Sequence, residues 1–133
     1  MKQINPKGGL GNMLFQIAAG YALAYKLGTD WAVLTPQSNI HGDMYNKYKS
    51  NILSKIPFIN TGYKHPIYNE PSFEYSPLPL EKNITLDGFF QSEKYFSHYK
   101  NLILDLFLQD CSYLNEAKSQ IGLYNTSSTV SLH

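Results

Sequence analysis

The chain has 133 residues, of which 43% are hydrophobic and 16% charged, and its formal net charge is +1. This length corresponds to one ordinary domain with a core of its own, and the composition excludes a disordered chain. The near-neutral charge argues against a nucleic-acid-binding protein, which would carry a basic surface. All eleven basic residues are lysines, so no arginine is available to grip a phosphate with a planar guanidinium group.

The sequence shows no pattern typical of export or membrane insertion. Residues 1–7 contain no apolar core of signal-peptide length, and no apolar run approaches the roughly 20 residues of a membrane span. The single cysteine, Cys111, excludes an internal disulfide framework and suits a reducing compartment. We therefore expect a cytoplasmic protein, and peripheral association with a membrane stays open.

The first predicted element is a helix over residues 13–27, between the breaker cluster 8–11 and Gly28. Asn12 is its expected N-cap, because asparagine accepts hydrogen bonds from the first free amides of a helix. Apolar residues lie nearly all round this helix, so we expect it to be largely buried. Residues 31–35 then predict a short buried strand.

The middle of the chain, residues 36–79, is rich in turn formers, lysines and tyrosines and has little periodicity. Residues 55–59 are the only strand candidate there. Residues 68–79 read as an extended loop, because each proline biases the preceding residue away from helix. A convincing strand follows over residues 84–90, and an amphipathic helix starts near Ser92.

The last part of the chain predicts a short helix over residues 114–121 and a strand over residues 129–133. Strands separated by helices of these lengths indicate an α/β layered domain. Because the chain stops inside a β-branched run, we expect the sequence to be a piece of a longer protein.

The first candidate site is the glycine-rich loop that precedes the first helix. Three glycines in four residues allow positive φ angles and a close approach of another group to the backbone. The helix N-terminus offers free amides and a partial positive charge, which suit a phosphate. A tight turn without a ligand explains the same residues equally well, and neither the P-loop nor the dinucleotide pattern is complete. The candidate residues are Gly8, Gly9, Leu10, Gly11, Asn12 and Gln16.

A second cluster of polar residues lies between the predicted strand 84–90 and the helix that follows it. Ligands of α/β sheets bind at the carboxyl ends of strands, so Gln91, Ser92 and Glu93 are placed to reach a cleft. Ser92 is equally a plain N-cap and Glu93 a first-turn acid. Asp87 could be a base or a turn acid. No histidines stand at metal-ligand spacing, so the sequence indicates no metal site.

These blocks resemble a known family. Residues 7–16 read Lys-Gly-Gly-Leu-Gly-Asn-Met-Leu-Phe-Gln and closely resemble the opening of family 11 α-1,2-fucosyltransferases (galactoside 2-α-L-fucosyltransferases), with Met13 where glutamine is usual. Residues 86–96 resemble the family's Gly-Tyr/Phe-Gln-Ser-Glu-Lys-Tyr-Phe block. Residues 130–133 resemble the start of its Val-Ser-x-His-x-Arg-Arg-Gly-Asp-Tyr motif. The resemblance spans nearly the whole chain but under half of a typical family member.

The resemblance implies a fold and an activity. The fold is α/β, a truncated Rossmann-like N-terminal domain of a GT-B-type glycosyltransferase. Residues 1–125 would form the acceptor-side domain, and residues 126–133 the first strand of a donor-binding domain. The activity is transfer of L-fucose from GDP-fucose to the 2-hydroxyl of a β-galactoside, with inversion and without a metal or other cofactor. The partners are then a nucleotide sugar and a glycan acceptor.

The same resemblance assigns roles to individual residues. The amides of Gly9 to Asn12 and the side chain of His133 would lie near the donor, while the arginines that hold its diphosphate lie beyond the chain. Asp87 and Glu93 are the candidate general bases. On this view the isolated chain is inactive. Two alternatives stay open: a truncated, catalytically inactive remnant, and a small α/β module that binds an anion at its glycine turn.

Overall fold

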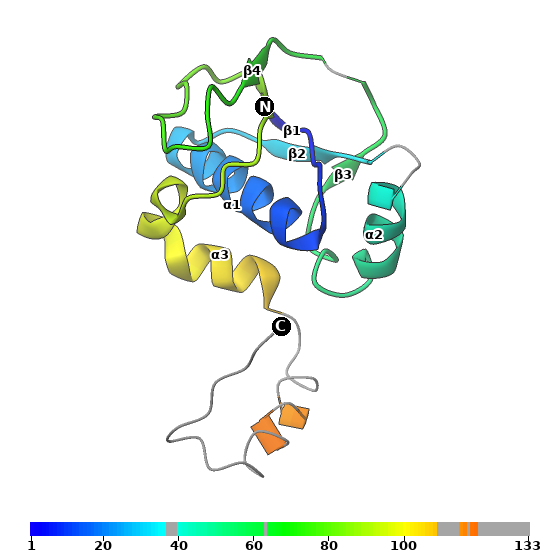
Figure 1. Cartoon of the computed structure of the whole chain (residues 1–133). Helices are drawn as coiled ribbons and strands as arrows, with labels where there is room; N and C mark the ends of the chain where they lie inside the picture. The colour runs from blue at the N-terminus through cyan, green and yellow to red at the C-terminus, as the bar shows by residue number, and fades with distance from the viewer. Residues whose placement is uncertain (37–39, 63, 109–114, 117, 120–133) are drawn as a thin grey trace.

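The fold is a parallel five-stranded sheet with helices packed against it (Figure 1). The computed structural model describes residues 1–36, 40–62, 64–108, 115–116 and 118–119. The strand order is β3-β2-β1-β5-β4, and every neighbouring pair is parallel. The strands are β1 (Lys2–Ile4), β2 (Trp31–Leu34), β3 (Phe58–Ile59), β4 (Ile67–Asn69) and β5 (Ile84–Asp87).

The helices are α1 (Leu10–Leu27), α2 (Ile40–Tyr48) and α3 (Lys100–Phe107), with the 3-10 turns η1 (Glu93–Tyr95) and η2 (Ser97–Tyr99) before α3. Figure 1 shows α1 against the sheet, α3 on the far side of α1, and α2 beside β3. The structure is therefore a mixed α/β domain, compatible with a Rossmann-like fold, as the sequence predicts. In the described part of the chain, no helix combines the length and apolar character needed to cross a membrane.

The central strand β1 marks the point where the strand order reverses. Gln3 of β1 stands opposite Ala32 of β2 on one side and opposite Thr85 of β5 on the other. From β1 the chain passes through α1 and β2 outward to β3, and it returns on the other side of β1 through β4 and β5. In open α/β sheets such a reversal leaves a crevice at the carboxyl ends of the two flanking strands, here β1 and β5.

Helix α1 forms the centre of the apolar core. Its residues contribute to two buried clusters, one around Ile17 and Val33 and one around Ala19 and Leu86. Gly20 allows the helix to approach β1 closely: a Cβ atom there would lie 2.4 Å from the side chain of Ile4. The apolar residues found nearly all round this helix in the sequence are thus accounted for, because the sheet and α3 contact it from different sides.

Several predicted boundaries are wrong by a few residues. Helix α1 starts at Leu10 and its N-cap is Gly9, not Asn12, whose side chain is engaged with the second block instead. The strand predicted over residues 84–90 ends at Asp87, because the chain turns sharply at Phe90, which has a φ of 50°. The strand predicted over residues 55–59 is reduced to Phe58–Ile59.

Three elements were not predicted: β1, α2 and β4. β1 carries two polar residues, Lys2 and Gln3, that are nonetheless fully buried. The helix expected from Ser92 is present as η1, η2 and α3. The strand predicted over residues 129–133, the domain boundary at residues 125–126 and most of the helix over residues 114–121 lie outside the described residues.

Candidate functional site

The loop after β1 is held in shape by a buried glutamine. Gln16 is fully buried, and its side-chain amide binds the backbone of Lys7 twice. The N–H of Lys7 donates to Oε1 of Gln16 at 2.8 Å, and Nε2 of Gln16 donates to the carbonyl of Lys7 at 2.8 Å. Gln16, a predicted cleft residue, therefore positions the loop and presents no free polar atom to a ligand.

A hydrogen bond between side chains joins the glycine-rich loop to the second block. Nε2 of Gln91 donates to Oδ1 of Asn12, although the two residues stand 79 positions apart. Gly8 makes this approach feasible, because its φ of 81° favours glycine and a Cβ atom there would lie 2.4 Å from Nδ2 of Asn12. Gly9 and Gly11 are exposed with open space around them, whereas Leu10 packs against the core. The structure thus brings together the two blocks that the sequence singled out.

Asp87 lies at the carboxyl end of β5, and both of its carboxylate oxygens are occupied. Oδ1 forms an ion pair with Nζ of Lys7, and Oδ2 accepts a hydrogen bond from Nδ2 of Asn5 at 2.9 Å. The side chain of Asp87 is 18% exposed and that of Lys7 37%. Lys7 and Asn5 both follow β1, so these contacts join the ends of the two strands that flank the reversal point.

The turn after β5 is held by a carboxylate from the neighbouring strand. Glu70, directly after β4, accepts hydrogen bonds from the backbone N–H of Phe89 at 2.6 Å and from that of Phe90 at 3.0 Å. Phe90 is fully buried with a φ of 50°, a conformation that is strained for a bulky residue. Gly88 leaves the space that Glu70 fills, since a Cβ atom there would lie 2.4 Å from Cβ of Glu70.

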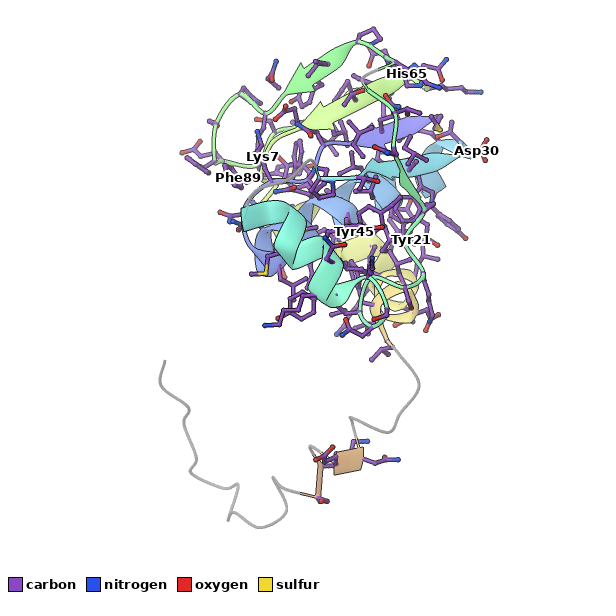
Figure 2. All side chains as sticks on the ribbon, turned by 90° about the vertical axis from the view of Figure 1, so that its right-hand side faces the viewer. Lys7, Tyr21, Asp30, Tyr45, His65 and Phe89 are labelled. Atoms are coloured by element: carbon purple, nitrogen blue, oxygen red, sulfur yellow. The ribbon has the colours of Figure 1, made fainter. Side chains whose placement is uncertain are left out.

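A cavity of about 300 Å³ opens beside this turn, at the carboxyl ends of β4 and β5. Two phenylalanines, Phe73 and Phe89, stack at its wall with ring centroids 5.9 Å apart. Nζ of Lys7 lies 5.5 Å from the centre of the Phe89 ring. Figure 2 shows Lys7 and Phe89 side by side, at the end of the sheet opposite Asp30. The cavity is lined by Lys7, Asn69, Glu70, Pro71, Ser72, Phe73, Asp87, Gly88 and Phe89.

Other predicted site residues lie elsewhere. The hydroxyl of Ser92 accepts a hydrogen bond from the N–H of Lys94 at 3.4 Å and so acts as the N-cap of η1. Glu93 is exposed on η1 and does not line the cavity. His133 is outside the described residues. Of the two candidate bases, only Asp87 is at the cavity.

Of the residues that line the cavity, the sequence predicts only Asp87; it does not predict the polar residues Lys7 and Glu70, the aromatic pair Phe73 and Phe89, or Asn5, which binds Asp87. Asn5 and Lys7 could have been found had β1 been predicted, because polar residues directly after a buried strand lie at the ligand-binding edge of a sheet. Glu70 gave no signal in the sequence, since it stands in a proline-rich stretch without periodicity.

The chemistry of the site is that of a small polar cavity with an aromatic wall. Two carboxylates, an ammonium group and an amide line the same cavity as two phenylalanine rings, a combination that can bind hydroxyl groups and the apolar face of a small ring. Among the residues that the structure describes, no three His, Cys, Asp or Glu side chains form a group that could hold a metal ion. Comparison of the chain with known protein families, with curated proteins and with solved structures gives no match.

Proposed function

We propose that the chain is the acceptor-side domain of a GT-B-type α-1,2-fucosyltransferase, which transfers L-fucose from GDP-fucose to the 2-hydroxyl of a β-galactoside. The proposal rests on the resemblance of residues 7–16 and 86–96 to that family. It is supported by one structural observation above all: these two blocks, far apart in the sequence, meet through Asn12 and Gln91 at the reversal point of the sheet.

The cavity beside the second block suits a sugar ring. The exposed face of Phe73 and the ring of Phe89 offer a surface on which the apolar face of a galactoside would stack. Asp87 and Asn69 supply oxygen and nitrogen atoms that would bind its hydroxyl groups. Phe73 is 74% exposed, so most of its ring is available for a sugar to cover.

Asp87 is better suited to holding the acceptor than to removing its proton. A general base needs a free carboxylate oxygen within hydrogen-bond reach of the reacting hydroxyl. Both oxygens of Asp87 are engaged, one by Lys7 and one by Asn5, so Lys7 would have to move before Asp87 could accept a proton. On the donor side, the exposed amides of the glycine loop would stabilise the charge that develops on the departing diphosphate.

Acceptor binding tests the proposal directly. Methyl β-galactoside is titrated into the full chain, and amide shifts are followed by NMR. We expect saturable binding in the millimolar range, about −4 kcal/mol, with shifts at Gly88 and Phe89. Phe89→Ala and Asp87→Asn should each weaken binding by roughly tenfold, since each removes a central contact.

The matched control is Asp105→Asn, the same change at an exposed position of α3. This variant should bind the galactoside as tightly as the unchanged chain. Absence of saturable binding, or an equal loss in Asp105→Asn, would rule out the cavity as an acceptor site. With GDP-fucose added, we expect no transfer by this chain, and robust transfer would refute the view that the residues gripping the donor lie outside it.

A second candidate is the small module that binds an anion at the glycine turn. It is favoured by the open N-terminus of α1, where Gly9 provides no side-chain cap and the first turn carries no acid. Inorganic pyrophosphate separates the two functions. Saturable pyrophosphate binding without galactoside binding would support the module, and galactoside binding would support the acceptor domain.

A further inference from the structure

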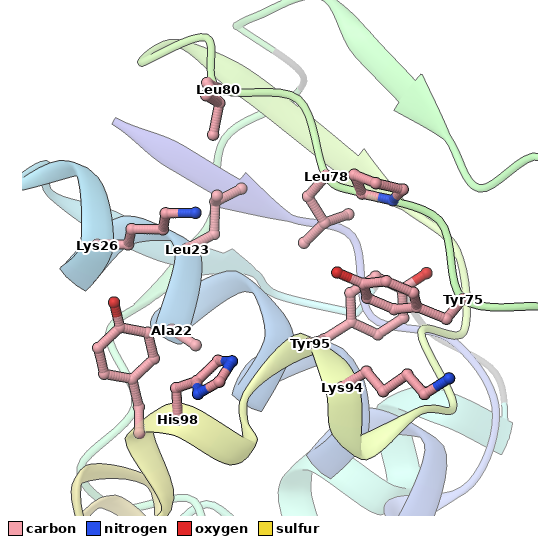
Figure 3. A pocket seen from close by; sticks show the side chains of 11 residues that line it. Ala22, Leu23, Lys26, Tyr75, Leu78, Leu80, Lys94, Tyr95 and His98 are labelled. Atoms are coloured by element: carbon pink, nitrogen blue, oxygen red, sulfur yellow. The ribbon is translucent and has the colours of Figure 1, made fainter.

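A second cavity, of about 420 Å³, lies at the other end of α1 (Figure 3). It is bordered by Ala22, Leu23 and Lys26 of α1, whereas no residue of α1 lines the first cavity, and the two cavities share no lining residue. The pocket is therefore distinct from the proposed acceptor site.

The walls of this pocket are aromatic and apolar. Tyr75, Tyr95 and Tyr99 contribute three rings, and Leu23 and Leu78 contribute aliphatic surface. The rings of Tyr75 and Tyr95 lie in contact, with centroids 4.9 Å apart. The hydroxyl of Tyr95 accepts a hydrogen bond from the N–H of Ser76 at 3.2 Å, which fixes the ring in place. The two rings are inclined by 53°, so a planar ring would stack on one of them and meet the edge of the other.

The charged side chains that line the pocket are two lysines, so they have the same sign. Lys26, Lys94 and His98 line it, and none of its lining residues carries a carboxylate. Figure 3 shows Lys26 beside Leu23, with His98 below them and Tyr75 and Tyr95 on the right. Within the described part of the chain, Lys26 makes no hydrogen bond or ion pair, unlike Lys7 in the first cavity.

Tyr95, which lines the pocket, carries no negative charge that would neutralise the two lysines. Burial raises the pKa of Tyr95 above its ordinary value of 10.0, and the hydrogen bond from Ser76 only partly opposes this. The phenol therefore stays neutral at neutral pH. The ammonium group of Lys94 lies 5.7 Å from the centre of the Tyr75 ring, so one cation is directed towards aromatic surface and the other is left free.

We propose that this pocket binds a small aromatic anion, a molecule in which a phosphate or carboxylate is joined to a single planar ring. The anionic group would lie between the ammonium group of Lys26, which no described residue neutralises, and the imidazole of His98, which would donate a hydrogen bond. The ring would lie against Tyr95 and Leu78, which bury its faces. An inorganic anion would leave the aromatic wall uncovered, and a neutral ring would leave Lys26 without a partner.

Phenyl phosphate is the probe that combines both features. It is titrated into the full chain and followed by NMR, with inorganic phosphate and phenol as the two halves of the probe. We expect phenyl phosphate to bind at least about tenfold more tightly than either half, with amide shifts at Lys26, Tyr95 and His98. Equal affinity for phosphate or phenol, or no saturation, would overturn the proposal.

A pair of lysine variants locates the anion. Lys26→Gln should weaken phenyl phosphate binding by about fivefold to tenfold, because it removes a charge-assisted contact. Lys47→Gln, the same change on α2, should leave the affinity unchanged. Equal losses in both variants, or none in Lys26→Gln, would exclude this pocket as the site. Lys26→Gln should still bind methyl β-galactoside like the unchanged chain, which keeps this test separate from that of the acceptor cavity.

Discussion

The centre of the sheet contains polar side chains that the fold has to satisfy one by one. Lys2 is fully enclosed, and its Nζ donates to the carbonyl of Glu81. Gln3 and Thr85, directly opposite each other on β1 and β5, share a hydrogen bond of 3.0 Å, and the N–H of Lys64 also donates to Gln3. These bonds compensate part of the cost of removing polar groups from water.

Lys2 makes the stability of the protein depend on pH. Burial lowers the pKa of Lys2 below its ordinary value of 10.5, and the charge of Glu81 opposes this only in part. Between the two values the unfolded chain binds more protons, so the free energy of unfolding should rise as pH increases towards 10.5. Lys2→Met has no such proton to lose. Urea unfolding at several pH values should show that the free energy of unfolding of the unchanged chain rises with pH relative to that of Lys2→Met. A difference that stays constant with pH would contradict a lowered pKa of Lys2.

Gly8 is the residue whose replacement should disturb the first block most. A Cβ atom in Gly8→Ala would meet Nδ2 of Asn12 at 2.4 Å while the backbone holds a φ of 81°. We expect a loss of about 1–2 kcal/mol in the free energy of unfolding, measured in urea. Gly11→Ala is the control, since α1 has open space there and alanine favours a helix by about 0.5–1 kcal/mol. Equal destabilisation of both variants would show that Gly8 has no special role.

At the scale of elements, the connection from β4 to β5 positions the second block. Glu70 at its start binds the two amides of the turn at Phe89 and Phe90, and Tyr95 near the end of the block accepts a bond from Ser76 of the same connection. A proline-rich stretch without regular structure therefore supports both cavities, the first through Glu70 and the second through the bond from Ser76 to Tyr95.

Glu70→Gln tests this connection. The amide retains one oxygen acceptor but loses the charge and the second oxygen, so we expect a loss of about 1–3 kcal/mol in the free energy of unfolding. Binding of methyl β-galactoside should weaken as well, because the turn at Phe89 loosens. Glu74→Gln makes the same change at an exposed position of the same connection. The free energy of unfolding of both variants is measured in urea. Equal stabilities of Glu70→Gln and Glu74→Gln would show that Glu70 does not stabilise the turn at Phe89.

The elements that the sequence predicts are those with an apolar pattern of their own. α1, β2 and the start of β5 carry long or dense apolar runs, and all three are confirmed within a few residues. β1 and β4 have no such pattern: β1 includes Lys2 and Gln3, and the edge strand β4 leaves Ile67 and Asn69 exposed. Their strand conformation comes from pairing with distant segments, which local patterns do not encode.

In the candidate site too, the features with a local sequence pattern were predicted and those that depend on distant contacts were not. The two blocks were predicted because glycines and polar residues at strand-to-helix junctions are visible in the sequence. Their meeting through Asn12 and Gln91, the ion pair of Lys7 with Asp87 and the support by Glu70 depend on the order of the strands. Neither the strand order nor these contacts could be derived from the sequence.

At the scale of the whole molecule, stability depends on how closely α1 approaches β1. In Gly20→Ala the new Cβ atom would lie 2.4 Å from the side chain of Ile4, so the helix has to move away from the sheet. We expect the cost of this overpacking, about 1–3 kcal/mol, to exceed the gain of up to about 1 kcal/mol in helix propensity. The midpoint of urea unfolding should therefore fall.

Ile4→Ala provides the matched background for that change, because it removes the atoms that the new methyl group meets. On its own it should destabilise the fold by about 2–5 kcal/mol. Within this background, Gly20→Ala should be neutral or stabilising, and the double-mutant cycle should show strong coupling. Additive effects would mean that the two residues do not limit the distance between helix and sheet.

The central position of β1 has a consequence for how the chain folds. Gln3 and Thr85 pair although they stand 82 positions apart, whereas β1 reaches its other neighbour, β2, across α1 alone. Closing the larger loop costs more chain entropy and delays contacts of long sequence separation. The unit of β1, α1 and β2 should therefore assemble first, leaving the far side of β1 unpaired until β5 arrives. During synthesis the nascent chain would expose that open edge for the time in which residues 35–87 are made.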